Sequence, residues 1–144
     1  MRLYLDNCVF NRPYDDQSSI RVRLEAEAKL NIQESIRSGE YELVWSYILD
    51  YENVKNPYWE RQEQISQWRK YAKYDILEDD TLLEHARQLH QFGMKKMDAL
   101  HIACATMAKA DYFLTTDKGI LKKAALVRTI SIKNPLDFIS GVLP

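Results

Sequence analysis

The sequence predicts an α/β fold in which a parallel sheet is covered by helices on both faces. Short apolar runs rich in strand-forming residues alternate along the chain with longer segments whose apolar residues recur at helical spacing. With four glycines and four prolines, the chain shows short turns and no linker, low-complexity tract or internal repeat. Strands separated by helices are typical of an α/β sandwich built around a parallel sheet.

The length and charge of the chain limit its organisation and its class. A chain of 144 residues predicts a single domain over 1–144, with one active site at most. Its composition, 46% hydrophobic and 28% charged, is that of a globular chain with its own core. A net charge of −1 excludes the strongly basic balance of a dedicated nucleic-acid coat protein, so any such binding must come from a local patch.

The first predicted strand is the run RLYLD at residues 2–6, which ends in a carboxylate as a buried strand entering a functional edge does. Residues 7–17 are predicted to form a loop, because they contain Asn11, Pro13 and a pair of aspartates.

A long amphipathic helix is predicted next, from Ser18 or Ser19, which are good N-terminal caps, to Gly39. Its apolar residues at helical spacing are Ile20, Leu24, Ala28, Ile32 and Ile36.

A second strand and helix follow. Residues 41–46 alternate like a strand, and Ser46 caps a helix that continues until Pro57. The remaining predicted elements are, in order, a helix over 58–72 with Ile65 and Trp68 inward, a short strand or turn at 74–77, a helix over 79–93 entered by Asp79 or Asp80, the least polar helix over 97–110, a strand over 112–116, a helical segment over 118–125, a strand over 127–132 and a final helical turn over 134–139.

The sequence also predicts a reduced, cytoplasmic setting without a membrane partner. The apolar stretch before Asp6 is too short for a signal peptide, and no uncharged run is long enough to span a bilayer. Cys8 and Cys104 lack metal-ligand or redox-motif spacing, so they read as small buried hydrophobic residues.

Two carboxylates are expected at one edge of the sheet. Asp6 and Asp117 each follow a buried run, and ligand sites in open α/β sheets lie outside the carboxyl ends of the strands. Asp117, ahead of Lys118 and Gly119, has the alternative role of capping the next helix. Capping is a weaker alternative for Asp6, because a loop is predicted after it.

For two more acids, Asp98 and Glu52, the sequence alone leaves several roles open. Asp98 lies at the start of the apolar helix and is expected to be nearly buried. A buried carboxylate must cap the helix, pair with a cation or bind a metal. As an acid in the first helical turn, Asp98 can also simply interact favourably with the helix dipole. Glu52 alone reads as a solvated residue, and Asp50 points elsewhere, because residues two apart do not share a helical face.

The four acids as a set point to a metal. Four carboxylates at one strand-end edge would repel one another unless a divalent cation neutralises them. Oxygen ligands of this kind suit Mg²⁺ or Mn²⁺, and the absence of clustered histidine and cysteine argues against zinc. Such a site handles phosphates and supports phosphodiester hydrolysis.

Three segments carry a resemblance to a known family: LYLDNCVFN at 3–11, WSYILDYEN at 45–53 and MDALHIACATMAKADYFLTTDKGIL at 97–121. Together they resemble the PIN domain of toxin-type, VapC-like endoribonucleases. The resemblance places the family's acids on Asp6, Glu52, Asp98 and Asp117, with Thr115 or Thr116 before the last. It implies a three-layer sandwich with a parallel sheet of about five strands, Mg²⁺- or Mn²⁺-dependent cleavage of single-stranded RNA, a cognate antitoxin and a homodimer.

The chain departs from the family pattern after the first acid. It has Asn7 where many members have a small threonine or serine, and a longer loop with Asp15 and Asp16, which we interpret as loop charges. This departure bears on the substrate and the rate of cleavage.

Binding of RNA requires a local positive surface. Besides Thr115 and Thr116, Lys118 and Arg12 are candidate phosphate contacts. His101 is interpreted as a hydrogen-bonded core residue, and His85 and His90 as surface residues. Six aromatic side chains can stack on bases, although packing in the core or a dimer is expected for most of them: Phe10, Tyr14, Tyr47, Tyr51, Tyr58 and Trp59.

The resulting hypothesis is a metal-dependent ribonuclease that leaves a 5′-phosphate. Asp6, Asp98 and Asp117 would bind the metal, and Glu52 would ligate it or position the attacking water. The alternative is a catalytically degenerate PIN-like module that binds RNA or a protein without cleavage. A phosphatase with a nucleophilic aspartate requires a second aspartate at the position of Cys8, and a phospho-acceptor signalling domain also fits poorly.

Overall fold

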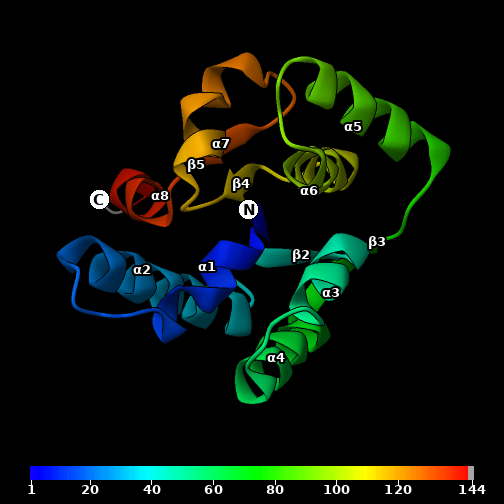
Figure 1. The fold of residues 1–144 in the computed structure, drawn as a ribbon. Coiled ribbons are helices and arrows are strands. Elements are labelled where there is room, and N and C mark those ends of the chain that lie inside the picture. The colour runs from blue at the N-terminus through cyan, green and yellow to red at the C-terminus, as the bar shows by residue number, and fades with distance from the viewer. Residues whose placement is uncertain (143–144) are drawn as a thin grey trace.

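In the computed structural model, which describes residues 1–142, five parallel strands form one sheet in the order β3-β2-β1-β4-β5 (Figure 1). The strands are β1 (Arg2–Leu5), β2 (Glu42–Ser46), β3 (Ala72–Ile76), β4 (Tyr112–Leu114) and β5 (Ser131–Lys133). The sheet confirms the predicted parallel arrangement, and the segment predicted as a strand or turn at 74–77 contributes residues 74–76 to β3. Residues 143 and 144 of the predicted domain lie outside the described residues.

Helices cover both faces of the sheet. Figure 1 shows α5 and α6 on one side and α1, α2 and α4 on the other, which confirms the predicted three-layer sandwich. The helices are α1 (Asn7–Asn11), α2 (Ile20–Arg37), α3 (Tyr47–Asn53), α4 (Trp59–Ser66), α5 (Asp80–Gln91), α6 (Lys96–Met107), α7 (Lys118–Lys122) and α8 (Pro135–Val142), with 3₁₀ turns η1 (Arg12–Tyr14), η2 (Gln67–Tyr71) and η3 (Ala124–Leu126). Among the described residues, no helix combines the length and hydropathy that crossing a bilayer requires.

The central strand β1 sets the position of the candidate site. Leu3, Tyr4 and Leu5 are completely buried, because β1 lies between β2 and β4 and both faces of the sheet are covered. Asp6 therefore leaves the sheet at the middle of its carboxyl edge. In an open α/β sheet, that edge is where ligands bind.

The prediction of a loop over 7–17 is wrong for residues 7–14, which are helical, and holds for residues 15–17. The side chain of Asp6 accepts a hydrogen bond from the N–H of Asn7 and caps α1, and η1 follows with Pro13 in its first turn. Proline favours the first turn of a helix as readily as a loop, and an aspartate after a strand is a good cap. The low weight given to capping by Asp6 was wrong for the same reason.

In the first two turns of helix α2, the buried face differs from the face that the apolar spacing predicts. Ile20 and Leu24 are exposed, whereas Glu25 and Lys29 are buried. Glu25 is drawn inward because its carboxylate meets three donors, the guanidinium groups of Arg12 and Arg21 and the side-chain amide of Asn134. The ion pairs, and not only the apolar residues, set the orientation of the first two turns.

Lys29 is buried without an acidic partner among residues 1–142. Its ammonium lies 5.6 Å from the ring centre of Phe10 and 5.4 Å from that of Trp68. Burial, together with the charge of Arg37, lowers the pKa of Lys29 from 10.5 to about 7. The folded state therefore binds this proton less tightly than the unfolded chain does.

We expect this lysine to make stability depend on pH in a defined direction. Because its pKa is lowered by folding, its contribution to the free energy of unfolding rises as pH increases from about 7 towards 10.5 and is least favourable below pH 7. Lys29→Met should raise the unfolding free energy at pH 7 by about 1–4 kcal/mol and remove this rise. Urea unfolding at several pH values measures both effects, with Lys73→Met, at an exposed position, as control. A Lys29→Met protein that is less stable than the wild type at pH 7 would contradict the assignment.

Candidate metal centre

Asp6 is the first residue beyond β1 and its carboxylate is held from two sides. Its N–H donates to the carbonyl oxygen of Leu114 at 2.9 Å, which continues the pairing of β1 with β4. Oδ1 accepts from the N–H of Asn7 at 2.8 Å, and Oδ2 accepts from the hydroxyl of Thr115 at 2.8 Å. Bonds to an ionised carboxylate are strong, so the side chain has one orientation.

Glu52 comes from α3, which begins directly after β2. Ser46 ends the strand and caps the helix, since its Oγ accepts from the N–H of Leu49 at 3.3 Å. The side chain of Glu52 is 29% exposed and faces the site. Asp50 accepts from the indole N–H of Trp45 at 2.9 Å instead, which confirms that the two acids point to different sides.

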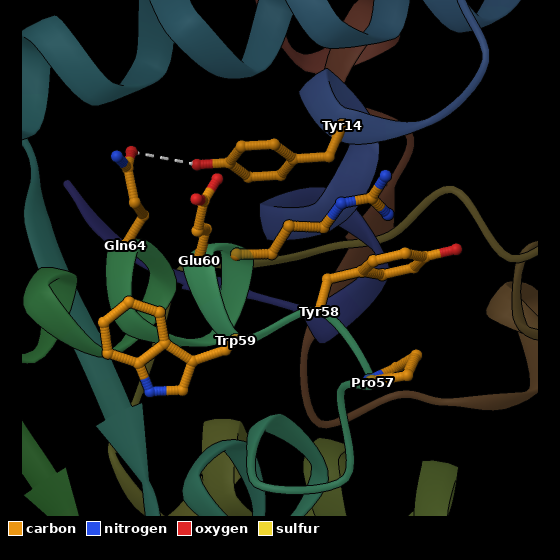
Figure 2. Close-up of a pocket in the computed structure, with 7 residues that line it drawn as sticks. Tyr14, Pro57, Tyr58, Trp59, Glu60 and Gln64 are labelled. Carbon is orange, nitrogen blue, oxygen red and sulfur yellow. Dashed lines mark hydrogen bonds between the residues drawn. The ribbon is translucent and has the colours of Figure 1, made fainter.

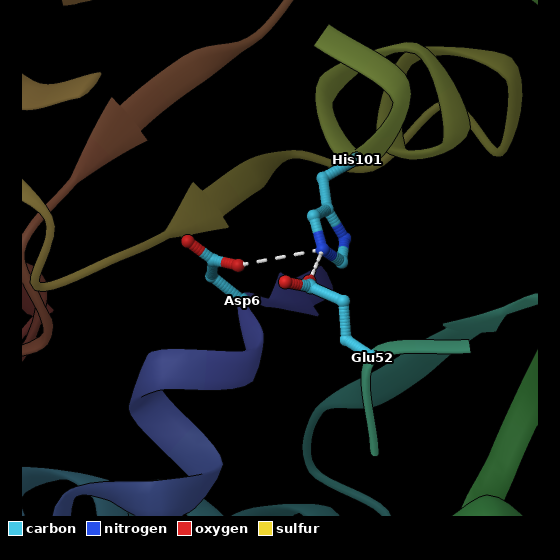
Figure 3. A group of neighbouring side chains, drawn as sticks. All are labelled: Asp6, Glu52 and His101. Carbon is cyan, nitrogen blue, oxygen red and sulfur yellow. Dashed lines mark hydrogen bonds and ion pairs between the residues drawn. The ribbon is translucent and has the colours of Figure 1, made fainter. Parts of the chain in front are cut away.

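His101, on α6, completes a compact group with these two acids (Figure 3). Its Nε2 contacts Oε1 of Glu52 and lies 3.7 Å from Oδ1 of Asp6. One donor atom from each of the three residues lies within 4.8 Å of the other two. Such a spacing and donor set fit a single divalent ion.

The environment of His101 is dominated by its acidic neighbours. The ring is 1% exposed, and its Nδ1 lies 2.6 Å from the hydroxyl of Tyr4. Burial lowers the pKa of His101, but the hydrogen bond to Glu52 and the negative charges of Asp6 and Asp98 more than offset it, so the pKa is raised overall. The prediction of a hydrogen-bonded core histidine is confirmed.

Asp98 lies one helical turn before His101 and is half-buried. Burial, reinforced by the negative charges of Asp6 and then Asp117, raises the pKa of Asp98 to about 6. The three carboxylates thus act on one another, as expected for acids gathered at one edge. Asp98 nevertheless lies outside the compact group of Asp6, Glu52 and His101.

Asp117 is exposed at the start of α7, whose N-terminus it caps. Its Oδ1 accepts from the N–H of Ile120 at 3.1 Å, so the alternative role considered for this residue is observed. Its own N–H donates to Oγ1 of Thr115 at 3.0 Å. Thr115 therefore links the Asp6 carboxylate to the backbone of Asp117, and is completely buried.

The other predicted contact residues lie in different settings. Thr116 is buried, and its N–H donates to the sulfur of Cys8 at 3.4 Å, whereas Lys118 is exposed. The guanidinium of Arg12 is engaged by Glu25 at 2.8 Å and Asp15 at 3.1 Å. A phosphate contact by Arg12 would thus compete with two carboxylates inside the protein.

Cys104 is buried as predicted, whereas Cys8 is only partly buried. Burial, with the negative charge of Asp6, raises the pKa of the Cys8 thiol to about 12, and burial also raises the pKa of Cys104 to about 12. Both thiols are therefore protonated at neutral pH, and a protonated thiol is a poor nucleophile and metal ligand.

Some of the predicted stacking aromatics line an open pocket between η1 and α4. Tyr14, Tyr58 and Trp59 are among the residues that line this cavity of about 630 Å³, and Figure 2 shows their side chains. Tyr58 and Trp59 are 56% and 70% exposed, and the guanidinium of Arg61 lies 4.1 Å from the ring centre of Tyr58. Phe10, in contrast, is completely buried in the core.

Comparison with known proteins finds no matching family model and no matching curated protein sequence. Solved structures do match. The crystal structure of FitAcB from Neisseria gonorrhoeae aligns over 92% of this chain and 97% of its own, with a TM-score of 0.60 and 14% identity. The crystal structure of VapBC2 from Rickettsia felis, bound to a DNA fragment from their promoter, aligns over 93% and 98%, with a TM-score of 0.57 and 14% identity.

The chain has a PIN-like fold. The alignment spans nearly the whole of this chain and of both solved chains, so the likeness covers the sheet and its helices. At 14% identity it shows the fold alone, and the function of this PIN-like chain must be argued from its site.

His101 is the member of the compact group that the sequence does not predict as a site residue. One signal was available: His101 follows Asp98 by three positions, so both lie on one face of α6. Histidine and cysteine do not cluster along the sequence, but the fold brings His101 to Asp6 and Glu52 from a distant segment.

Proposed function

We propose that this PIN-like chain is a divalent-metal-dependent endoribonuclease that hydrolyses single-stranded RNA. The observation that carries the proposal is the convergence of Asp6, Glu52 and His101 from three separate elements at the middle of the carboxyl edge, with Asp98 and Asp117 close enough to interact electrostatically. Uncompensated carboxylates at a half-buried site are costly, and a divalent cation removes that cost.

The donor set fits Mg²⁺ or Mn²⁺, with Asp6 and Glu52 as oxygen ligands. When bound, the ion supplies positive charge that polarises a phosphoryl oxygen, promotes ionisation of a water and offsets charge on the leaving oxygen. We propose that Asp98 and Asp117 complete the centre when the ion and RNA are present. Asp98 is half-buried, and Asp117 is exposed towards solvent, where substrate can reach it.

The side chains around the centre have separate roles in the proposed reaction. Thr115 keeps the Asp6 carboxylate oriented through its 2.8 Å hydrogen bond. Glu52, the most exposed member of the compact group, ligates the ion or orients the attacking water. Attack on phosphorus with departure of the 3′-oxygen would leave a 5′-phosphate on the downstream product. Lys118, Thr116 and Arg12 stay candidate contacts to the RNA backbone.

The experiment that tests this function is cleavage of end-labelled single-stranded RNA by the purified protein in Mn²⁺, in Mg²⁺ and in EDTA. Cleavage is expected with either ion, none in EDTA, and a 5′-phosphate on the new end. Asp98→Asn should lose activity, whereas Asp50→Asn, whose carboxylate faces Trp45 and Arg69, should cleave like the wild type. Equal cleavage by Asp98→Asn and the wild type would contradict a role for Asp98 in the reaction. Cleavage in EDTA would contradict the dependence on a divalent metal.

The biological setting that we propose is a toxin restrained by a cognate antitoxin. Support comes from the structural neighbour VapBC2, which was solved on a DNA fragment from its own promoter. A homodimer and a cytoplasmic location belong to the same proposal. A small DNA-binding protein encoded beside this chain should co-purify with it and suppress its cleavage of RNA, and a co-expressed neighbour that leaves cleavage unchanged would contradict the pairing.

A further inference from the structure

The two ring nitrogens of His101 face different surroundings. Nε2 faces Glu52 and Asp6 (Figure 3). Nδ1 lies 2.6 Å from the hydroxyl of Tyr4, in the core. The ring is 1% exposed, so its orientation is set by these contacts and not by water. The partner on one nitrogen of a buried histidine fixes what the other nitrogen can do.

Tyr4 has two hydrogen-bond partners in the core, Ser46 and His101. Its hydroxyl lies 2.6 Å from Oγ of Ser46 and 2.6 Å from Nδ1 of His101. A hydroxyl has one proton, so when Tyr4 donates to Ser46 its oxygen accepts from Nδ1–H. Nε2 is then the nitrogen that faces the two carboxylates, and its contact with Glu52 is a hydrogen bond when Nε2 carries a proton. A divalent ion between the three groups would replace that proton and accept the Nε2 lone pair.

We propose that Nε2 of His101 is a nitrogen ligand of the divalent ion, and that it makes the centre bind Mn²⁺ in preference to Mg²⁺. The inference rests on the proposed metal-dependent function and narrows its choice of ion. Mg²⁺ prefers an all-oxygen, near-octahedral shell and retains its waters, whereas affinity for sites with nitrogen donors increases along the first-row divalent metals. Replacing one oxygen ligand by imidazole therefore disfavours Mg²⁺ relative to Mn²⁺.

Tyr4 acts in this proposal as a positioning residue that ties two ligands together. Its ring stacks on Phe113 at 5.4 Å and meets the imidazole edge-on at 5.7 Å, so the phenol and the histidine hold each other in place. Its hydroxyl partner Ser46 also caps α3, the helix that carries Glu52. Outer partners of this kind set the orientation of metal ligands and their affinity.

The direct test is pulsed electron paramagnetic resonance of Mn²⁺ bound to the unmodified protein. A nitrogen ligand gives a ¹⁴N modulation of the electron spin echo, which should change to the ¹⁵N pattern when the protein's histidine is ¹⁵N-labelled. The signal should disappear in His101→Asn and persist in His85→Asn, a histidine on α5 away from the centre. Bound Mn²⁺ without nitrogen modulation in the wild type would overturn the inference, and this result needs no variant to fold.

Calorimetric titration separates the inference from the function on which it rests. The wild type should bind Mn²⁺ more tightly than Mg²⁺, and His101→Asn should lose at least ~10-fold in Mn²⁺ affinity and most of the difference between the two ions. Tyr4→Phe, which keeps the stacked ring, should weaken Mn²⁺ about 10-fold with the melting temperature as a check on folding. An unchanged ratio in His101→Asn overturns the inference alone. Failure of the wild type to bind either ion overturns both the inference and the metal-dependent function.

Discussion

Replacing Asp6 with asparagine is expected to lower the rate of RNA cleavage by at least ~100-fold, because bound metal contributes several kcal/mol of transition-state stabilisation and each 1.36 kcal/mol is tenfold in rate. Asp6 is the carboxylate on which the centre depends. It lies at the end of the central strand, belongs to the compact group with Glu52 and His101, and is held by Asn7 and Thr115. Asparagine has nearly the same shape but lacks the negative charge.

Single-turnover cleavage of a labelled RNA measures this loss. Asp50→Asn is the matched control. It also removes a carboxylate, but the Asp50 carboxylate faces Trp45 and not the compact group. Thermal unfolding of both variants shows whether the fold is retained. A folded Asp6→Asn protein that cleaves as fast as the wild type would contradict the role of Asp6.

The second large effect concerns stability and Glu25. We expect Glu25→Gln to lower the free energy of unfolding by about 3 kcal/mol, the lower end of the cost of removing one partner from a buried ion pair. Glu25 is completely buried, and its Oε1 accepts from Nε and Nη2 of Arg12 at 2.9 and 2.8 Å. Its Oε2 accepts from Asn134 at 2.5 Å. Arg12 is partly solvated and also meets Asp15, which limits the loss.

Urea unfolding of Glu25→Gln measures this cost, with Glu27→Gln as the control on the exposed side of the same helix. The variant should also loosen η1, because Arg12 connects that turn to α2. Equal stability of the two variants would show that the cluster around Glu25 contributes nothing to the fold.

The elements with strong local signals could be predicted from the sequence. Ser19, Ser46 and Asp79 each cap a helix through a hydrogen bond to a residue three positions on, and such caps depend only on nearby residues. The loop predicted over 7–17 is wrong for residues 7–14 because Pro13 is compatible with both a loop and a helical first turn. Local signals that serve two structures cannot decide between them.

Features that depend on distant residues were harder to predict. Glu25 is buried with its carboxylate against Asn134, 109 positions away. The apolar spacing of α2 therefore placed Ala28, Ile32 and Ile36 correctly in the core, but it was wrong for the first two turns, where Ile20 and Leu24 are exposed. His101 belongs to the centre because Tyr4 and Glu52, 97 and 49 positions away, lie against its ring. The position of Asp6 at the end of its strand could be inferred, since parallel strands share one carboxyl edge, whereas Glu52 was placed in the site by the family resemblance. The contact of either acid with His101 could not be inferred.

The central claim is that a divalent ion binds at the carboxyl edge between Asp6 and Glu52. Anomalous diffraction from crystals soaked in Mn²⁺ tests it most directly. The account predicts a manganese peak within bonding distance of the Asp6 and Glu52 carboxylates. Crystals that take up manganese only at other positions, with these two side chains unchanged, would contradict it.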